Sequence, residues 1–193
     1  GLGVGIDPQQ HRAFEKRFGV KMVEFWAMTE TGRLIVDNVE PRLTDTPAFG
    51  RATPGLEARV VDDDDRDVPP GQLGELVIRH SAAAPRKGLF SGYLKNEEAT
   101  AEAWRNGWFH SGDVVVRDET GMFYFVDRKK NIIRRSGENI AAAEVEGCLA
   151  SHEAVKQVAV LAVPDELREE EVMACVIARS RAGTEALARD LFE

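Results

Sequence analysis

The segment between residues 107 and 140 constrains the fold of this chain more than any other. Apolar runs at 114–116 and 122–126 lie on either side of a turn at 118–121, and this pattern predicts two neighbouring strands. Just before the first run, Asp113 follows a Ser-Gly pair, which is typical of a turn. The segment therefore predicts ordered β structure with a carboxylate directly beside it.

The same segment has the residue types that suit a nucleotide. The Asp113 carboxylate can accept hydrogen bonds from both hydroxyls of a ribose, and cationic side chains can face a phosphate. The cations follow the second strand, at Arg128, Lys129, Lys130, Arg134 and Arg135. Taken locally, Asp113 also fits a turn cap, and the basic run also fits a nucleic-acid or nuclear-localisation patch or a solvated face. The interleaved Ile132 and Ile133 favour ordered structure over a basic tail.

A second polar segment, FWAMTETG, occupies residues 25–32 and follows a predicted strand at 21–25. The Thr29 hydroxyl can hydrogen-bond a phosphate oxygen, while the Glu30 carboxylate can help to hold Mg²⁺. The ring of Trp26 could stack on a base. On its own this segment is a weak signal, because Thr-Glu is a common pair and a tryptophan at a strand end is usually a core residue.

Composition and charge exclude several classes of protein. The net charge is −8, which argues against a general nucleic-acid binder. No apolar run approaches the roughly 20 residues of a membrane helix, and the first residues lack the features of a signal peptide. Cys148 and Cys175 lie in no CxxC or Cys/His cluster, so we expect reduced packing residues and a cytoplasmic location.

Helices and strands are predicted along the whole chain. Asp7 can cap a helix that starts at Pro8 and stops before Gly19. Further helices are expected at 97–104, at 142–150 with Val145 and Leu149 on one face, and after Thr184. Strands are expected at 56–61, 74–79, 155–163 and 172–178. The acidic run at 62–65 lies between two strands and ahead of Pro-Pro-Gly, which favours a solvated turn over a metal site.

Three motifs together resemble the adenylate-forming enzymes, which include acyl-CoA synthetases, peptide-synthetase adenylation domains and luciferases. They are FWAMTETG at 25–32, WFHSGD at 108–113 and RKKNIIRRSGENI at 128–140. The resemblance implies an α+β fold. Residues 1–129 would be the carboxy-terminal portion of the large domain, with a β-barrel-like subdomain, and residues 130–193 would be part of a small mobile domain, with the hinge near Lys130.

The resemblance also implies roles for single residues. Trp26 would lie at the adenine, Thr29 at the α-phosphate and Glu30 at the metal, and the last two would be catalytic. The ribose hydroxyls would be bound by Asp113, and the nucleotide would also be contacted by Phe125 and Arg128. Arg134, Ser136 and Gly137 would face the CoA channel, where glycine permits close backbone approach. His110 is interpreted as a packing or hydrogen-bonding residue. The sequence departs from the family pattern at Trp26 and Ala27, where Tyr and Gly are usual.

The expected activity is that of an AMP-forming acyl-CoA synthetase, with a small carboxylic acid, ATP and CoA as substrates and Mg²⁺ as cofactor. The sequence of residues 128–146 resembles that of ligases for short or medium acids, such as crotonobetaine/carnitine-CoA ligases. The family's phosphate loop and terminal catalytic lysine would lie outside residues 1–193, so the chain alone is expected to be inactive. Two alternatives stay open: a peptide-synthetase-type adenylation domain, and a non-catalytic adenylate-binding or interaction module. The sequence indicates no oligomeric state.

Overall fold

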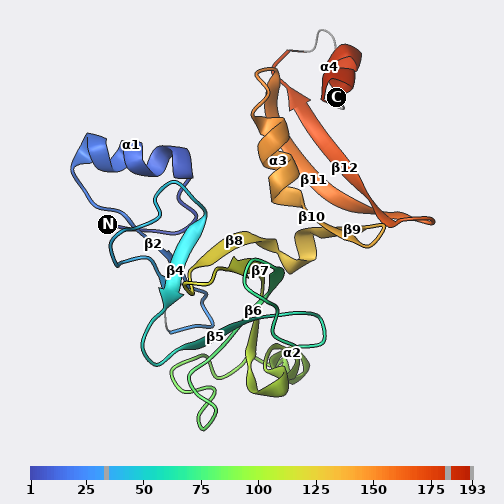
Figure 1. Cartoon of the computed structure of the whole chain (residues 1–193). Helices are drawn as coiled ribbons and strands as arrows, with labels where there is room; N and C mark the ends of the chain where they lie inside the picture. The colour runs from blue at the N-terminus through green and yellow to red at the C-terminus, as the bar shows by residue number, and fades with distance from the viewer. Residues whose placement is uncertain (33–34, 181–183, 192–193) are drawn as a thin grey trace. The chain divides into compact units, whose positions relative to one another are not determined.

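The chain folds into two compact units, Gly1–Val126 and Asp127–Glu193 (Figure 1). The structure, a computed structural model, describes residues 1–32, 35–180 and 184–191. Both units mix helices with antiparallel sheet, as the α+β prediction requires. The hinge at Lys130 stays a prediction, because the division into units does not show motion.

The first unit has two α-helices, one 3₁₀ helix and eight strands among its described residues. The helices are α1 (Pro8–Phe18), α2 (Glu97–Ala103) and the 3₁₀ turn η1 (Arg105–Gly107). The strands are β1 (Leu2–Gly3), β2 (Val23–Trp26), β3 (Ile35–Val36), β4 (Ala48–Ala52), β5 (Glu57–Val61), β6 (Leu73–Arg79), β7 (Phe109–Arg117) and β8 (Phe123–Arg128), whose last two residues enter the second unit.

These eight strands form one sheet in the order β1-β2-β3-β4-β8-β7-β6-β5. β1 and β2 are parallel, whereas β5 is antiparallel to β6 and β6 is antiparallel to β7. Since β1 and β5 are both edge strands, the expected barrel-like subdomain is an open sheet in the described part of the chain. The topology brings β7, which contains Asp113, beside β6.

The start and end of α1 follow from its sequence. Asp7 caps the helix by accepting the backbone N–H groups of Gln9 and Gln10, at 2.8 and 3.2 Å, and Pro8 occupies the first turn. Gly19 ends the helix in the left-handed conformation, with φ of 62°. The predicted helix and both of its boundaries are confirmed.

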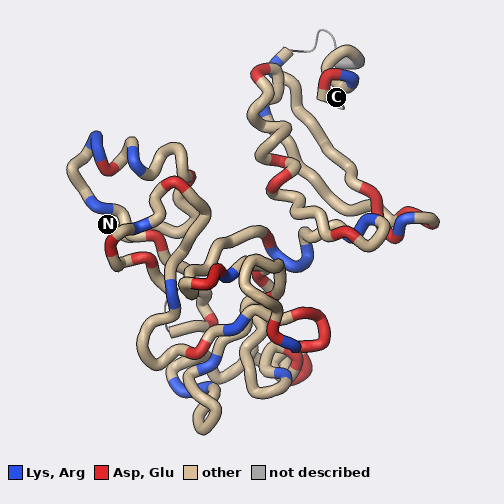
Figure 2. The backbone as a smooth tube through the Cα atoms, viewed as in Figure 1, with Lys and Arg blue, Asp and Glu red and all other residues tan. Residues whose placement is uncertain are grey.

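The acidic run at 62–65 forms the turn between β5 and β6. The Asp62 carboxylate accepts the N–H groups of Asp64 and Arg66, each at 2.9 Å, which is the usual way for aspartate to stabilise a turn. Acidic residues, red in Figure 2, recur along both units and are interspersed with the basic ones. The prediction of a turn here is confirmed.

Aromatic and aliphatic side chains from several strands build the core of the first unit. Phe49 contacts Trp26 on one side and Phe123 on the other, with ring centroids 6.5 and 6.0 Å apart. Trp104, at the end of α2, packs on Phe109 of β7. This core holds β2 and β7 together, and those two strands carry Trp26 and Asp113.

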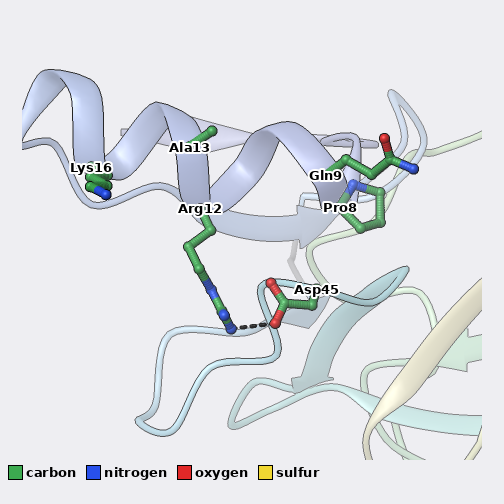
Figure 3. A pocket seen from close by; sticks show the side chains of 6 residues that line it. All are labelled: Pro8, Gln9, Arg12, Ala13, Lys16 and Asp45. Carbon is green, nitrogen blue, oxygen red and sulfur yellow. Dashed lines mark hydrogen bonds and ion pairs between the residues drawn. The ribbon is translucent and has the colours of Figure 1, made fainter.

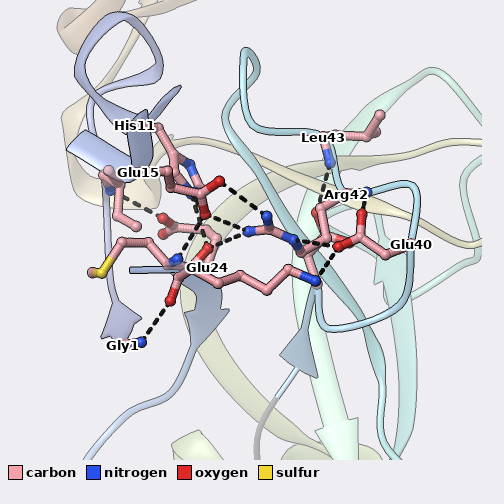
Figure 4. A network of polar contacts seen from close by, with 11 residues as sticks. Gly1, His11, Glu15, Glu24, Glu40, Arg42 and Leu43 are labelled. Carbon is pink, nitrogen blue, oxygen red and sulfur yellow. Dashed lines mark hydrogen bonds and ion pairs between the residues drawn. The ribbon is translucent and has the colours of Figure 1, made fainter. Parts of the chain in front are cut away.

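A polar network centred on the buried side chain of Arg42 ties α1 to the segment after β3 (Figure 4). The Arg42 side chain is only 8% exposed, and its guanidinium donates to both oxygens of Glu15, at 2.8 and 3.1 Å. The same guanidinium donates to the Met22 carbonyl and to Glu40. The hydrogen bond from Arg42 lowers the pKa of Glu15 to about 2. Arg42 thus joins a helix, a strand entrance and a loop.

The second unit is a four-stranded antiparallel sheet with a helix packed on it. The strands are β9 (Ile132–Arg135), β10 (Glu138–Ala141), β11 (Val155–Asp165) and β12 (Glu169–Ala178), in the order β10-β9-β12-β11. The helices are α3 (Ala142–Ala150), α4 (Thr184–Asp190) and the 3₁₀ turn η2 (Lys129–Asn131). Val145 and Leu149 of α3 pack against a core of Ile133, Ala142 and Val160, so the predicted apolar face is confirmed.

Two further sequence expectations concern the whole chain. Cys148 and Cys175 are both free and exposed, so the prediction that they are packing residues is wrong. No helix in the described part of the chain is both long and apolar enough to span a membrane.

Candidate nucleotide site

Asp113 lies inside strand β7, and this corrects the expectation that it follows a turn. The β6–β7 register pairs Glu75 with Val114 and Val77 with His110, so three residues of β7 oppose the single residue Leu76. The Ser-Gly pair is therefore part of a β-bulge, a device that redirects a side chain within a strand. The sequence signal for a turn was wrong in kind, because a bulge uses the same residue types as a loop.

Side chains satisfy the backbone groups that this bulge removes from the ladder. Ser111 Oγ donates to the Leu76 carbonyl at 2.7 Å and accepts the Asp113 N–H at 3.1 Å. The Gly112 N–H donates to Glu75 Oε1 at 3.1 Å. Gly112 has φ of 70°, a conformation that favours glycine, and no atom lies within 4 Å of where a Cβ would be. The Ser-Gly pair is thus explained by backbone geometry and hydrogen bonding.

Trp26, at the end of β2, donates its indole N–H to Asp113 Oδ2 at 2.7 Å. Both residues are buried, since Trp26 is 5% exposed and Asp113 is 1% exposed. The indole holds one carboxylate oxygen in place by a charge-assisted hydrogen bond. Stacking on a base stays a prediction for Trp26, and its ring is a core ring in this structure. The structure does bring together the two polar segments that the sequence singled out.

Glu75 and His110 form a buried polar cluster on the β6–β7 pair. Glu75 is 5% exposed, and its Oε2 lies 3.3 Å from Arg105 Nη2 and 3.3 Å from His110 Nδ1. His110 Nε2 also lies 3.7 Å from Asp65 of the acidic turn. The interpretation of His110 as a packing and polar-contact residue agrees with this position. Sequence reasoning missed Glu75, since a single glutamate in a strand gives no local signal.

Thr29 and Glu30 lie at the tip of a tight turn after β2. The turn is closed by the Thr31 N–H, which donates to the Met28 carbonyl at 3.0 Å, and the Thr31 hydroxyl contacts both backbone groups of Met28. Thr31 is buried, whereas Thr29 is exposed. Thr31 therefore holds the turn while Thr29 faces solvent, which suits the predicted contact of Thr29 with a phosphate.

The segment at 88–93 packs against this turn. Phe90 N–H donates to the Glu30 carbonyl at 2.9 Å, and a Cβ on Gly32 would lie 2.5 Å from the Gly88 carbonyl, so glycine is required there. Tyr93 donates its hydroxyl to Glu30 Oε1 at 3.1 Å. Burial, followed by the hydrogen bond to Glu30, raises the pKa of the Tyr93 phenol. Sequence analysis did not single out Tyr93.

Phe125 and Arg128 lie along β8, which leads from the first unit into the second. Phe125 is 37% exposed, and Arg128 is also exposed. Asp127 is instead 3% exposed and accepts the Ala143 N–H of α3 at 2.8 Å and the Asn131 amide at 3.0 Å. The Asp-Arg pair therefore divides its roles, because Asp127 holds the start of α3 while Arg128 is presented to solvent.

Residues 134–137 form the tip of the β9–β10 hairpin. Ser136 and Gly137 have φ of 52° and 82°, which matches the two-residue turn preferred by twisted hairpins. Arg134 and Arg135 are tied to β12, by the Arg134 N–H to Glu170 at 2.7 Å and the Arg135 side chain to Glu171 at 2.6 Å. Gly137 is therefore explained by the turn, and its approach to a CoA channel stays a prediction, as do the roles of Arg134, Ser136 and Lys130.

Pockets lined by described residues lie elsewhere on the surface, and two of them are large enough to consider. One is lined by α1 and Asp45, where Arg12 forms an ion pair with that aspartate (Figure 3). The other lies in the second unit, between α3, β12 and α4, and is mainly apolar. None of the predicted nucleotide-binding residues lines either pocket, so neither carries the site.

The described site in the first unit is thus a buried, positioned carboxylate beside a turn with an exposed hydroxyl and a second carboxylate. Such a set can accept hydroxyl groups at Asp113 and contact phosphate or a phosphate-bound cation at Thr29 and Glu30. These are the groups that the sequence predicted for a nucleotide.

Two family profiles match the sequence. The profile described as AMP-binding enzyme matches residues 2–94, and the profile described as AMP-binding enzyme C-terminal domain matches residues 144–193. Together they match well over half of the chain. The chain belongs to the AMP-binding, adenylate-forming enzyme family.

Curated relatives narrow the likeness. The chain is 38% identical over 178 residues to the crotonobetaine/carnitine–CoA ligase of Salmonella arizonae, which covers 90% of the chain and 33% of that protein. A protein of the same name from Escherichia coli is 39% identical over the same coverage. The chain spans about a third of the length of these relatives.

Solved structures show the same fold. ATP-bound MatB from Rhodopseudomonas palustris is 27% identical, with a TM-score of 0.74, and the match covers 94% of this chain and 35% of that one. The amide bond synthetase McbA from Marinactinospora thermotolerans is 30% identical, with a TM-score of 0.71, over 98% of this chain and 38% of that one.

Proposed function

We propose that this chain is part of an AMP-forming acid–thiol ligase that activates a carboxylic acid with ATP and transfers the acyl group to CoA. The observation that carries the proposal is the buried Asp113 carboxylate, held by the Trp26 indole and a side-chain-bonded bulge. The ligase names of the curated relatives support the reaction class. The free cysteines suit a reducing, cytoplasmic setting.

In the first half-reaction, a carboxylate oxygen of the acid forms a bond to the α-phosphorus of ATP, and the bond to pyrophosphate breaks. Asp113 would hold the ribose through its two hydroxyls and so fix the α-phosphate relative to the acid. Thr29 would donate a hydrogen bond to an α-phosphate oxygen, where negative charge develops. Phe125 and Arg128 would complete the contacts to the nucleotide.

The residues present fit Mg²⁺. In the described part of the chain no group of three or more His, Cys, Asp or Glu could hold a metal by itself. Mg²⁺ commonly takes one or two carboxylates together with phosphate oxygens and water, so the single part-exposed Glu30 suits it. Such an ion would offset negative charge on the phosphates. The Tyr93 hydroxyl would orient the Glu30 carboxylate.

In the second half-reaction, the CoA sulfur forms a bond to the acyl carbon, the bond to AMP breaks, and the thiol proton passes to solvent. Arg134, Ser136 and Gly137, at the hairpin tip of the second unit, would then face the thiol channel after a rotation about Lys130. The acid would be a small carboxylic acid. The names of the curated relatives contain crotonobetaine and carnitine, so these two acids are the first to test.

The proposal is tested with the complete protein. Pyrophosphate exchange that depends on crotonobetaine or carnitine, followed by CoA-dependent release of AMP, is the expected result. ATP binding without turnover of any acid would instead favour the non-catalytic module.

A different acyl acceptor is the second candidate, and one observation favours keeping it. A solved structure at 30% identity is an amide bond synthetase, so this fold also serves a protein whose name indicates amide formation. Turnover of preformed acyl-adenylate should be compared with CoA, an amine and a carrier protein as acceptors. Preference for CoA supports the ligase; preference for a carrier protein supports a peptide-synthetase-type domain.

A further inference from the structure

We propose that Glu75 is a positioning residue for Asp113. Its carboxylate would fix the bulge that directs Asp113 toward the ribose, so that discrimination between ribose and deoxyribose depends on Glu75. This inference rests on the proposed function, because it assumes that Asp113 accepts the ribose hydroxyls.

Glu75 contacts the bulge at the Gly112 peptide. Gly112 is the middle residue of the three that oppose Leu76, and its N–H cannot use the ladder there. Glu75 Oε1 accepts that N–H at 3.1 Å, one residue before Asp113. A change in the Gly112 peptide therefore changes the direction of Asp113 directly.

Placing the Glu75 carboxylate at this position costs free energy. Glu75 is 5% exposed, and burying a charge is unfavourable unless cations and hydrogen-bond donors surround it. The Arg105 guanidinium supplies this, since its Nη2 donates to Glu75 Oε2 at 3.3 Å, and His110 Nδ1 lies 3.3 Å from the same oxygen. An apolar residue would join two strands as well or better, so the carboxylate is needed for something other than strand pairing.

The two carboxylate oxygens of Glu75 have different partners. Oε2 faces the Arg105–His110 side, which leaves Oε1 directed at the Gly112 N–H. Asp113 is then held from two directions, at its backbone through Gly112 and at Oδ2 by the Trp26 indole at 2.7 Å. Since ligand contacts must be placed within fractions of an ångström, loss of either hold should weaken the ribose contact.

The experiment measures the ratio of kcat/KM for ATP to that for 2′-deoxy-ATP in the complete enzyme, by pyrophosphate exchange. Glu75→Leu keeps the volume but removes the acceptor, and the ratio should fall about tenfold, toward that of Asp113→Ala. Glu75→Gln keeps an oxygen for the Gly112 N–H and should retain the ratio within about threefold. Glu57→Gln is the matched control, since Glu57 pairs with Arg79 at 2.6 Å on the same sheet but lies in the edge strand β5, which pairs with β6 and not with β7.

If Glu75→Leu does not fold, Glu75→Asp replaces it, because the shorter side chain keeps its charge but withdraws from Gly112; the same fall in the ratio is expected. An unchanged ratio in Glu75→Leu or Glu75→Asp, with a collapsed ratio in Asp113→Ala, would overturn the inference and leave the ribose role of Asp113 intact. An unchanged ratio in Asp113→Ala itself would overturn the ribose assignment, and the inference with it.

Discussion

Trp26 and Asp113 are 87 residues apart in the sequence and are joined by a hydrogen bond of 2.7 Å inside the first unit. The bond links the strand that leads to Thr29 and Glu30 with the strand that carries the predicted ribose-binding carboxylate. A change at either residue is therefore expected to act on both parts of the proposed nucleotide site.

The carboxylate of Asp113 should be required for the use of ATP. Two charge-assisted hydrogen bonds to the ribose are each worth about 1.5–3 kcal/mol, and every 1.4 kcal/mol is a factor of ten. Asp113→Ala in the complete enzyme should therefore lower kcat/KM for ATP by about a hundredfold or more. Steady-state kinetics with varied ATP measure this, and values close to those of the unchanged enzyme would show that Asp113 serves only the fold.

The indole N–H of Trp26 should matter more than its ring. Trp26→Phe keeps an aromatic ring but removes the donor to a buried carboxylate, so we expect a loss of about 1.5–3 kcal/mol in the free energy of unfolding beyond the packing cost, and a higher KM for ATP. Trp104→Phe is the matched control, because Trp104 is also 5% exposed but its Nε1 has no hydrogen-bond partner among the residues that the structure describes. Denaturant unfolding of both variants gives the comparison. Equal losses of unfolding free energy in the two variants would show that the Trp26 N–H does not stabilise the fold. An unchanged KM for ATP would favour stacking of the ring on the base.

Local signals predicted the elements whose ends are set by neighbouring residues. The ends of the helix at Pro8–Phe18 are set by Asp7 and Gly19. Helix α3 is predicted by the periodicity of its apolar residues, and the β5–β6 hairpin by the turn residues between its strands. These features depend on residues within one or two turns of each other, so the sequence shows them directly.

The site was predicted only in its residue types. Nothing near Asp113 indicates that Gly112 is bonded to Glu75, 37 residues away, or that the Ser-Gly pair is a bulge inside a strand. Arg42 likewise contacts Glu15 across 27 residues. Such contacts are set by strand order and register, which single-sequence patterns do not determine.

Acid should weaken the Glu15–Arg42 pair. The pKa of Glu15 is lowered from 4.5 to about 2, mainly by the hydrogen bond from Arg42. A carboxyl whose folded pKa is lowered stabilises the fold above its unfolded pKa, and that contribution is lost as the pH falls toward the folded value. Glu15→Gln should therefore cost about 1–3 kcal/mol at pH 7, and this cost should shrink steadily between about pH 5 and pH 2.

Denaturant unfolding at several pH values measures this effect. Asp45→Asn is the control, because Asp45 pairs with Arg12 of the same helix α1, and this pair is 71% and 52% exposed and should contribute little (Figure 3). A cost of Glu15→Gln that does not vary with pH would mean that the charge of Glu15 is not what stabilises the network.

The 193-residue chain by itself should not catalyse pyrophosphate exchange with any carboxylic acid. It spans about a third of its curated relatives, and the resemblance places the phosphate loop and the terminal lysine outside it. Purified chain is assayed beside the complete enzyme. Measurable exchange by residues 1–193 would mean that the residues described here carry more of the chemistry than we propose.

Lys130 is exposed and lies in the 3₁₀ turn η2 at the start of the second unit. One site must serve two half-reactions, and we expect a rotation of the second unit about Lys130 between them. Rotation needs backbone freedom, which proline removes by fixing φ near about −65°. Lys130→Pro in the complete enzyme should therefore retain acyl-adenylate formation but slow thioester formation severely. Lys130→Ala, which removes the side chain and leaves φ free, should retain both. Pyrophosphate exchange and CoA-dependent consumption of preformed adenylate measure the two steps separately; an equal loss in both, or in neither, would place the pivot at another residue.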